Sequence, residues 1–242
     1  MAIFEEPWLR ELWARTAPTE GGVSLDPAIL YVVLGVAAVG IGAPPLWRVL
    51  RVAITLVHEL GHALVGVLVG RKFTGFVVRG DMSGHAVTKG PARGFGRVIT
   101  TWAGYPAPAV VGAGLAWLGA NGWAAPAIAA CLGVLIVSLV RVRSLLTALV
   151  MFAAIAATAA LWWFRDDALQ APVLLGAGTV LVVGAWRHLA AVWGSGGRSS
   201  DPGVLAQLTR VPAFLWNTTF ALVCLAASAV VGLEFWTVLR PS

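Results

Sequence analysis

The stretch TLVHELGHALVGVLVG, residues 55–70, places two histidines and a glutamate inside a run that otherwise has the composition of a membrane helix. An ionisable side chain within a bilayer is costly, so three of them in one helical turn require a common reason. His58, Glu59 and His62 form the pattern His-Glu-x-x-His. Residues four apart lie on the same side of a helix, so both imidazoles can reach one ion.

This pattern predicts a metal centre. Imidazole nitrogen binds Zn²⁺ readily, and a catalytic zinc keeps one position open for water. Glu59 lies to one side of the two histidines on the helix, where it can act on that water as a base. Arg51 and Thr55 extend the same polar face. The alternative is a cluster that only forms hydrogen bonds between helices.

The composition of the whole chain is not that of a soluble globular domain. Of 242 residues, 59% are hydrophobic and 12% are charged, and the mean hydropathy is +0.84. The pI is about 10.3, but the basic residues lie between apolar runs, as in loops at a membrane surface. We therefore expect membrane lipid, and no nucleic acid, as a partner. The basic residues are mostly arginine, which with abundant Ala, Gly and Trp suggests a bacterial source.

The apolar runs predict an all-α polytopic membrane protein with about six to seven transmembrane helices and a small hairpin after the second. One crossing needs about 20 apolar residues. The predicted spans are 27–47, 50–70, two within 98–140 separated by a turn at 119–123, 144–164, 170–193 and 211–239.

Three segments between or before these spans have another character. Residues 1–26 predict an amphipathic helix at the membrane interface, with Trp8 and Trp13 near the headgroups. Residues 71–97 alternate polar and apolar side chains between glycines and predict a small surface β-hairpin. Residues 194–203 form a Gly/Ser loop. No second domain is evident, so 1–242 is expected to be a single membrane-embedded domain.

The positions of Lys and Arg predict the orientation. If the N-terminus, 71–97, 141–143 and 187–210 share one side, that side carries 13 of these residues and the other side carries 4. Basic loops lie in the cytoplasm. This predicts a multi-pass protein of the cell membrane, with the hairpin and the metal centre facing the cytoplasm.

A zinc centre of this kind needs a third protein ligand. The other candidates are placed elsewhere: Asp26 before the first span, Asp81 and His85 in the hairpin, Asp166 and Asp167 in a loop on the opposite side, Glu234 near the far end of the last span, and His188 at the cytoplasmic end of the sixth. Asp201 remains as the candidate. Asp before Pro also predicts an N-cap with Pro202 at the first helical position, and one carboxylate oxygen can cap while the other binds metal.

Three further polar residues have simpler interpretations. His85 is predicted to be an exposed hairpin residue, with guarding the site as the alternative. His188 is predicted to be an interfacial side chain. Asn217 is predicted to form hydrogen bonds between helices.

The HELGH stretch within a membrane helix resembles the site-2 protease family of intramembrane zinc metalloproteases. Small bacterial members have a similar downstream pattern, and here it reads Ser200-Asp201, Leu205-Ala206, Thr209, Pro212 and Trp216; AGY at 103–105 resembles part of their third helix. The resemblance implies that His58, His62 and Asp201 bind Zn²⁺ and that Glu59 is the general base. The chain departs from the family in lacking Asn-Pro before Asp201.

The expected function is hydrolysis of peptide bonds within or next to the membrane, in a membrane-protein or peptide substrate. We expect the substrate to pair as a strand with an edge of the 71–97 hairpin. One alternative is a zinc-binding membrane protein that does not cleave peptides and uses the metal structurally or as a sensor. A transporter is the other, but no second helix has a polar face comparable to 51–62. The sequence predicts no oligomeric state.

Overall fold

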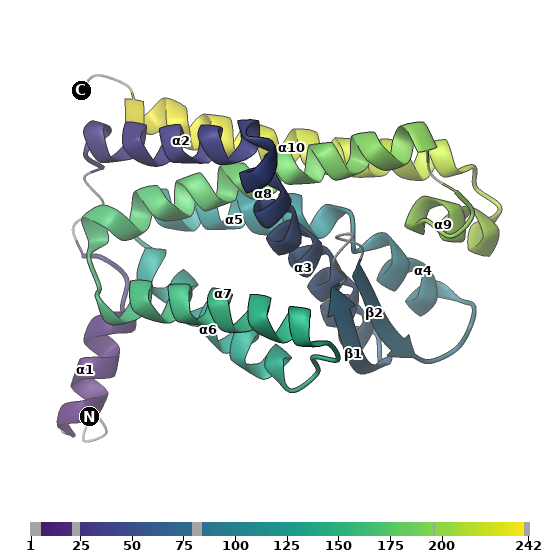
Figure 1. Ribbon diagram of the computed structural model, residues 1–242, viewed down its shortest axis with the longest axis horizontal. Coiled ribbons are helices and arrows are strands. Elements are labelled where there is room, and N and C mark those ends of the chain that lie inside the picture. The colour runs from purple at the N-terminus through teal and green to yellow at the C-terminus, as the bar shows by residue number, and fades with distance from the viewer. Residues whose placement is uncertain (1–5, 21–24, 79–83, 196, 240–242) are drawn as a thin grey trace.

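The computed structural model describes residues 6–20, 25–78, 84–195 and 197–239, and these ranges are mostly helical (Figure 1). The helices are α1 (Pro7–Thr16), α2 (Pro27–Gly42), α3 (Pro44–Leu68), α4 (Phe95–Trp102), α5 (Pro106–Ala120), α6 (Ala124–Leu139), α7 (Leu145–Trp163), α8 (Asp167–Ser195), α9 (Asp201–Thr209) and α10 (Ala213–Leu239). The strands β1 (Lys72–Val78) and β2 (Gly84–Lys89) form one antiparallel sheet after the second apolar helix. This confirms the helical fold with a small hairpin.

Four helices in the described ranges, α3, α7, α8 and α10, are long and apolar enough to cross a membrane. The helices α2, α5 and α6 are apolar but shorter. The predicted turn at 119–123 is confirmed, because α5 ends at Ala120 and α6 begins at Ala124. The run 98–140 does not consist of two helices alone, however, because its first residues belong to the short helix α4.

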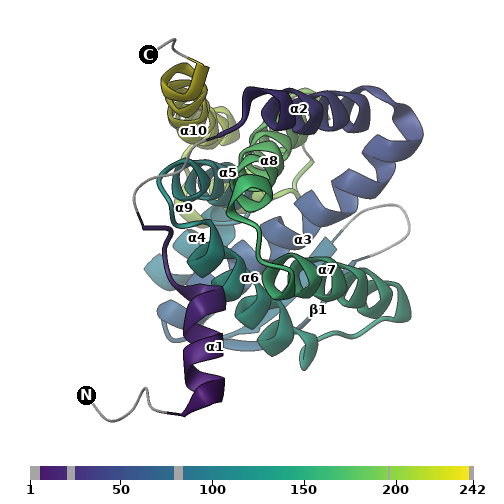
Figure 2. The same ribbon diagram turned by 90° about the vertical axis from the view of Figure 1, so that its left-hand side faces the viewer.

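The centre of the protein is formed by α5, α8 and α10, which are seen nearly end-on in Figure 2. Their buried side chains are Ala109, Ala116, Val182, Ala185, Leu189, Val192, Phe220, Cys224, Ala227 and Val231, joined by Leu205 of α9. Helices α5 and α8 approach closely because Gly112 has no side chain. A Cβ atom added to it would lie 2.6 Å from the carbonyl oxygen of Gly178. Small residues at such crossings let backbones touch, which strengthens packing where lipid gives no hydrophobic drive.

One end of the protein, the strand end, holds β1, β2, the α6–α7 connection and α9 (Figure 1). The outer edge of β1 is used there, because the Phe76 backbone accepts from Arg143 N–H at 3.2 Å and donates to the Arg141 carbonyl at 3.1 Å. The Phe76 side chain is fully buried against Leu56 and Met151. The hairpin is therefore anchored in the core through β1 and is more than a surface feature.

The opposite end, the N-terminal end, holds α1 and the α5–α6 and α7–α8 connections. Thr19 N–H donates to the Gly122 carbonyl at 2.8 Å, and Arg165 Nη1 donates to the Ala14 and Ala17 carbonyls at 2.6 and 2.9 Å. The predicted N-terminal helix is confirmed. The prediction that the N-terminus and the hairpin share one side does not agree with the structure, because these hydrogen bonds hold α1 at the end of the protein opposite the hairpin (Figure 1).

The reason for this difference lies in the first two apolar segments. Helix α2 runs in the same direction as α8: Val33 lies against Gly176, and the Ile41 carbonyl accepts from Arg187 Nη1 at 2.9 Å. Helix α3 then crosses α8 obliquely, with Ile54 against Gly184 (Figures 1 and 2). The segments 27–47 and 50–70 were expected to cross in opposite directions, and this is wrong. Helices α2 and α3 both run from the N-terminal end toward the strand end, so together they span the protein once.

Candidate metal centre

The two histidines of α3 point at a common position. His58 Nε2 and His62 Nε2 lie 3.1 Å apart, and their rings are edge-to-face with centroids 4.8 Å apart. The helix sets this geometry, since four residues complete slightly more than one turn. Both side chains are largely buried, with 14% and 13% of their surfaces exposed.

Asp201 completes the group from the first turn of α9. Its Oδ2 atom lies 3.3 Å from His58 Nε2 and 3.1 Å from His62 Nε2. The structure does not use Asp201 as the helix cap: Ser200 is the N-cap, and its hydroxyl accepts from Gly203 N–H at 3.4 Å. The Asp201 carboxylate is therefore turned toward the histidines, and the predicted Asp cap is wrong by one residue.

The donor set fits a zinc ion. Tetrahedral zinc with bonds of about 2.0–2.1 Å holds its ligand atoms about 3.3 Å apart, close to the three separations here. Asp201 Oδ2 is buried without a hydrogen-bond partner in the described part of the chain, as expected of an atom that serves a cation. Burial alone would raise the pKa of the Asp201 carboxyl, but the adjacent His62 and His58 outweigh it and hold that pKa below its ordinary value. Asp201 is thus a carboxylate, the form that binds metal.

His62 is oriented from behind by α4. Its Nδ1 atom lies 2.7 Å from the Thr100 carbonyl oxygen, so Nδ1–H donates and Nε2 keeps its lone pair for the metal. Thr100 lies in the last turn of α4, where carbonyl groups lack partners within the helix. The end of this short helix therefore selects the tautomer of His62 that can bind metal.

Gly104, in the turn between α4 and α5, lies directly over the two imidazoles. A Cβ atom built on it would lie 2.7 Å from His58 Nε2 and still closer to His62 Nε2. The turn reaches this position because Gly61 of α3 has no side chain: a Cβ there would meet the Ala107 side chain and lie 2.9 Å from the Ala103 carbonyl oxygen. The space where the donor atoms converge is thus kept open by a glycine.

Glu59 is buried, with 5% of its surface exposed, and lies between the histidines in the sequence of α3. It is not among the three groups whose ligand atoms converge. It lies near enough to His62 and Tyr105 to interact electrostatically with both. This placement suits a group that acts beside a metal rather than on it.

Two aromatic side chains at the centre carried no predicted role there. Tyr105 meets the His58 ring edge-on with centroids 4.9 Å apart, and the His188 ring of α8 lies 6.3 Å from the same ring. His188 is partly buried and lies beside the site, a place that its predicted interfacial role did not include. His188 is an ionisable residue near the end of the apolar run 170–193, and this was the available signal. For Gly104 the sequence carried no indication of a role at the metal centre beyond its place in AGY at 103–105.

The remaining candidate residues lie elsewhere. Asp26 caps α2 by accepting from Ala28 N–H at 2.8 Å. Asp166 and Asp167 lie at the N-terminal end, as does Glu234, which accepts from the Asn121 side chain at 3.4 Å. Asn217 is buried, but its Oδ1 atom has no partner among the described residues, so the predicted interhelical bond is not formed by that atom. Asp81 and the His85 side chain fall outside the described residues.

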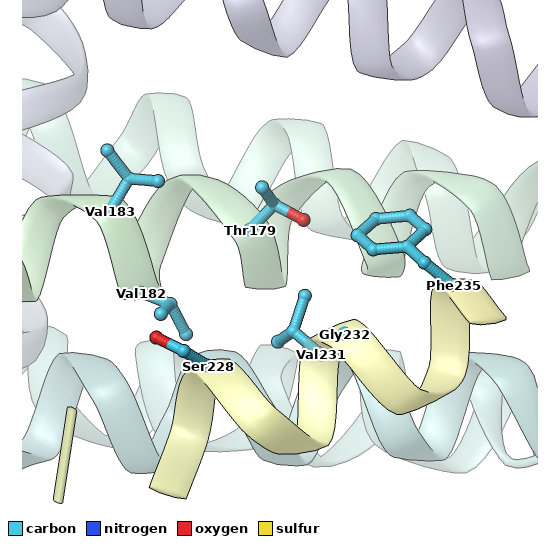
Figure 3. Close-up of a pocket in the computed structure, with 7 residues that line it drawn as sticks. All are labelled: Thr179, Val182, Val183, Ser228, Val231, Gly232 and Phe235. Atoms are coloured by element: carbon cyan, nitrogen blue, oxygen red, sulfur yellow. The ribbon is translucent and has the colours of Figure 1, made fainter. Parts of the chain in front are cut away.

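A separate hollow of about 220 Å³ lies between α8 and α10 (Figure 3). Its lining is Thr179, Val182, Val183, Ser228, Val231, Gly232 and Phe235. None of these side chains ionises near neutral pH, so this hollow offers no acid, base or metal ligand.

The geometry agrees with a comparison against protein families. A family model described as Peptidase M50B-like matches residues 29–231, most of the chain and all of the residues of the metal centre. The protein belongs to this family. The Peptidase M50B-like proteins are part of the site-2 protease family, so the predicted resemblance is confirmed. Comparison with curated proteins and with solved structures gave no match.

Proposed function

We propose that this M50B-like protein is an intramembrane zinc metalloprotease that hydrolyses peptide bonds within or next to the membrane. The convergence of His58 Nε2, His62 Nε2 and Asp201 Oδ2 on one point carries the proposal. Family membership supports the metalloprotease chemistry. Zinc held by these atoms would polarise the scissile carbonyl and make the attacking water more acidic.

Residues of the chain orient a ligand, keep space for the substrate and transfer the proton. Thr100 fixes the tautomer of His62, and Gly104 keeps space for the reacting groups. Glu59 accepts the proton of the attacking water and then passes it to the nitrogen of the departing amine. Burial of Glu59 limits competing water around it, so the carboxylate acts in a low-dielectric site.

The strand end is proposed to face the cytoplasm of a bacterial cell. The N-terminal arginines lie at the opposite end. Most of the described Lys and Arg residues nevertheless lie at the strand end, in 71–72, 89–97, 141–143 and 198–210. Basic segments favour the cytoplasmic side. The metal centre lies at this end of a multi-pass protein, where water can reach it from the cytoplasm.

We propose that the hairpin presents the substrate and that the strand which pairs with it is β2. The edge of β1 already pairs with 141–143, whereas the Thr88 carbonyl on β2 accepts from the Arg71 side chain and meets no second strand among the described residues. A cleaved segment would add to β2 through backbone hydrogen bonds.

We expect Thr88→Pro to raise KM several-fold, because proline removes a backbone donor from the edge of β2. Thr88→Ala is the matched control, since both variants lose the hydroxyl that accepts from Arg71 Nε but only proline loses the N–H. The measurement is the initial rate of cleavage against substrate concentration. Equal KM values for the two variants would exclude pairing at this position.

The experiment that tests the proposed function is elemental analysis and cleavage by purified protein, with Asp201→Ala beside wild type. Two imidazoles alone hold zinc weakly, so the affinity should fall by more than the 10–100-fold that loss of an outer partner costs. Cleavage should be lost with the metal. Asp26→Ala is the control, because it removes an exposed capping carboxylate far from the centre.

Two results would count against the proposal in different ways. Full zinc retention by Asp201→Ala would remove Asp201 from the ligand set. Zinc in the wild-type protein without cleavage of any offered membrane or peptide substrate would favour the zinc-binding, non-proteolytic alternative.

A further inference from the structure

Tyr105 is held rigidly at the metal centre although it is not a ligand. It follows Gly104 in the α4–α5 turn, immediately before the first residue of α5. On one side it meets His58 edge-on, with an interplanar angle of 84°. On the other it stacks on Phe220 of α10, with centroids 5.1 Å apart and an angle of 14°. Contacts from two different helices therefore fix the phenol ring beside the ligands.

The Tyr105 hydroxyl, by contrast, makes no hydrogen bond within the part of the chain that the structure describes. A tyrosine in such a position ordinarily finds a partner for its O–H. Two carboxylates, Asp201 and Glu59, lie near enough to interact with it electrostatically. The hydroxyl is thus an unused proton donor on a fixed ring that lies against the ligand His58.

We infer that Tyr105 is a catalytic residue that donates a hydrogen bond to the carbonyl oxygen of the scissile peptide bond. This inference rests on the proposed function. When the water oxygen bonds to the carbonyl carbon, the π electron pair moves onto the carbonyl oxygen, and the Tyr105 O–H stabilises that charge while keeping its own proton. When the C–N bond breaks, the pair returns to re-form C=O, and the amine leaves with the proton carried by Glu59.

A fixed donor is effective here because it needs no reorientation as charge develops. Donors placed in advance at the oxygen of an acyl-transfer transition state contribute about 10²–10³ in kcat when measured by their removal. The two ring contacts supply that fixed placement for Tyr105.

Tyr105→Phe tests the inference, because phenylalanine keeps the ring and its contacts with His58 and Phe220 and removes only the oxygen. We expect kcat to fall by about 10²-fold, with KM and zinc affinity unchanged. Zinc affinity is measured by competition with a chelator. Tyr31→Phe is the matched control: Tyr31 is the other tyrosine of the chain, exposed on α2, and its variant should match wild type in all three quantities.

A second measurement does not depend on turnover. A peptide phosphinate mimics the tetrahedral transition state, and its binding to Tyr105→Phe should be about 10-fold or more weaker than to wild type. Unchanged kcat and unchanged phosphinate affinity would overturn the inference. So would a loss of zinc affinity in step with activity, because Tyr105 would then hold the ligands in place.

The two proposals fail differently. If wild-type protein binds the phosphinate but cleaves no substrate, the proposed protease function fails. The ratio of phosphinate affinities of wild type and Tyr105→Phe still shows whether Tyr105 contacts the bound oxygen. If wild-type protein with zinc does not bind the phosphinate, the inference about Tyr105 is overturned.

Discussion

Glu59→Gln is expected to lower kcat by about 10²–10⁴-fold while zinc remains bound. The amide has nearly the same size as the carboxylate, so it fills the same buried position on α3. It does not accept a proton from water at neutral pH, so both proton transfers in the proposed reaction are lost. Zinc stays because the three converging donor atoms belong to other residues. The measurements are zinc per protein by elemental analysis and the rate of product formation from a membrane substrate.

Glu234→Gln is the matched control for this variant. Glu234 lies on α10 at the N-terminal end, and a glutamine there can still accept from the Asn121 side chain. Wild-type kcat is expected. If Glu59→Gln cleaves at the wild-type rate with zinc bound, Glu59 is not the base and the mechanism is wrong.

Gly104→Ala is expected to remove the metal altogether. The new methyl group would lie 2.7 Å from His58 Nε2 and closer still to His62 Nε2, in the space where the donor atoms converge. The imidazoles have little room to retreat, because His62 is tied to Thr100 and both rings are packed in the interior. Overpacking of this kind costs about 1–3 kcal/mol in an apolar core, and here it also displaces ligands that must be placed within tenths of an ångström.

The readouts for Gly104→Ala are zinc affinity by chelator competition and cleavage rate, with helical content measured to show that the fold persists. Gly114→Ala is the control: it makes the same change on α5, where no atom lies within 4 Å of the new Cβ. It should bind zinc and cleave like wild type. Wild-type zinc affinity in Gly104→Ala would show that the turn moves freely away from α3, contrary to the close contact at Gly61.

The limits of hydropathy are clearest at α2 and α3. Both segments were recognisable as apolar runs, but a run gives no direction for the helix that it forms. Sixteen residues of α2 span only about 24 Å, less than the hydrocarbon core of about 30 Å. Pro44 begins a new helix at this point and allows a change of direction. The N-terminal segment was consequently expected at the wrong end, although its helix was recognised.

His58, Glu59 and His62 were determined by the sequence alone, because one helical turn brings them together and the helix period is a local property of the chain. The same local rules gave the extents of α7 and α10 to within a few residues. Asp201 was a candidate with two interpretations, and only the tertiary structure decided between them by bringing Asp201 of α9 to the histidines of α3 and giving the cap to Ser200. Gly104, Tyr105 and His188 also reach the centre only through packing of α4, α5 and α8 on α3. Such contacts depend on which backbones can approach one another, and this is a property of the assembled helices rather than of any single stretch of sequence.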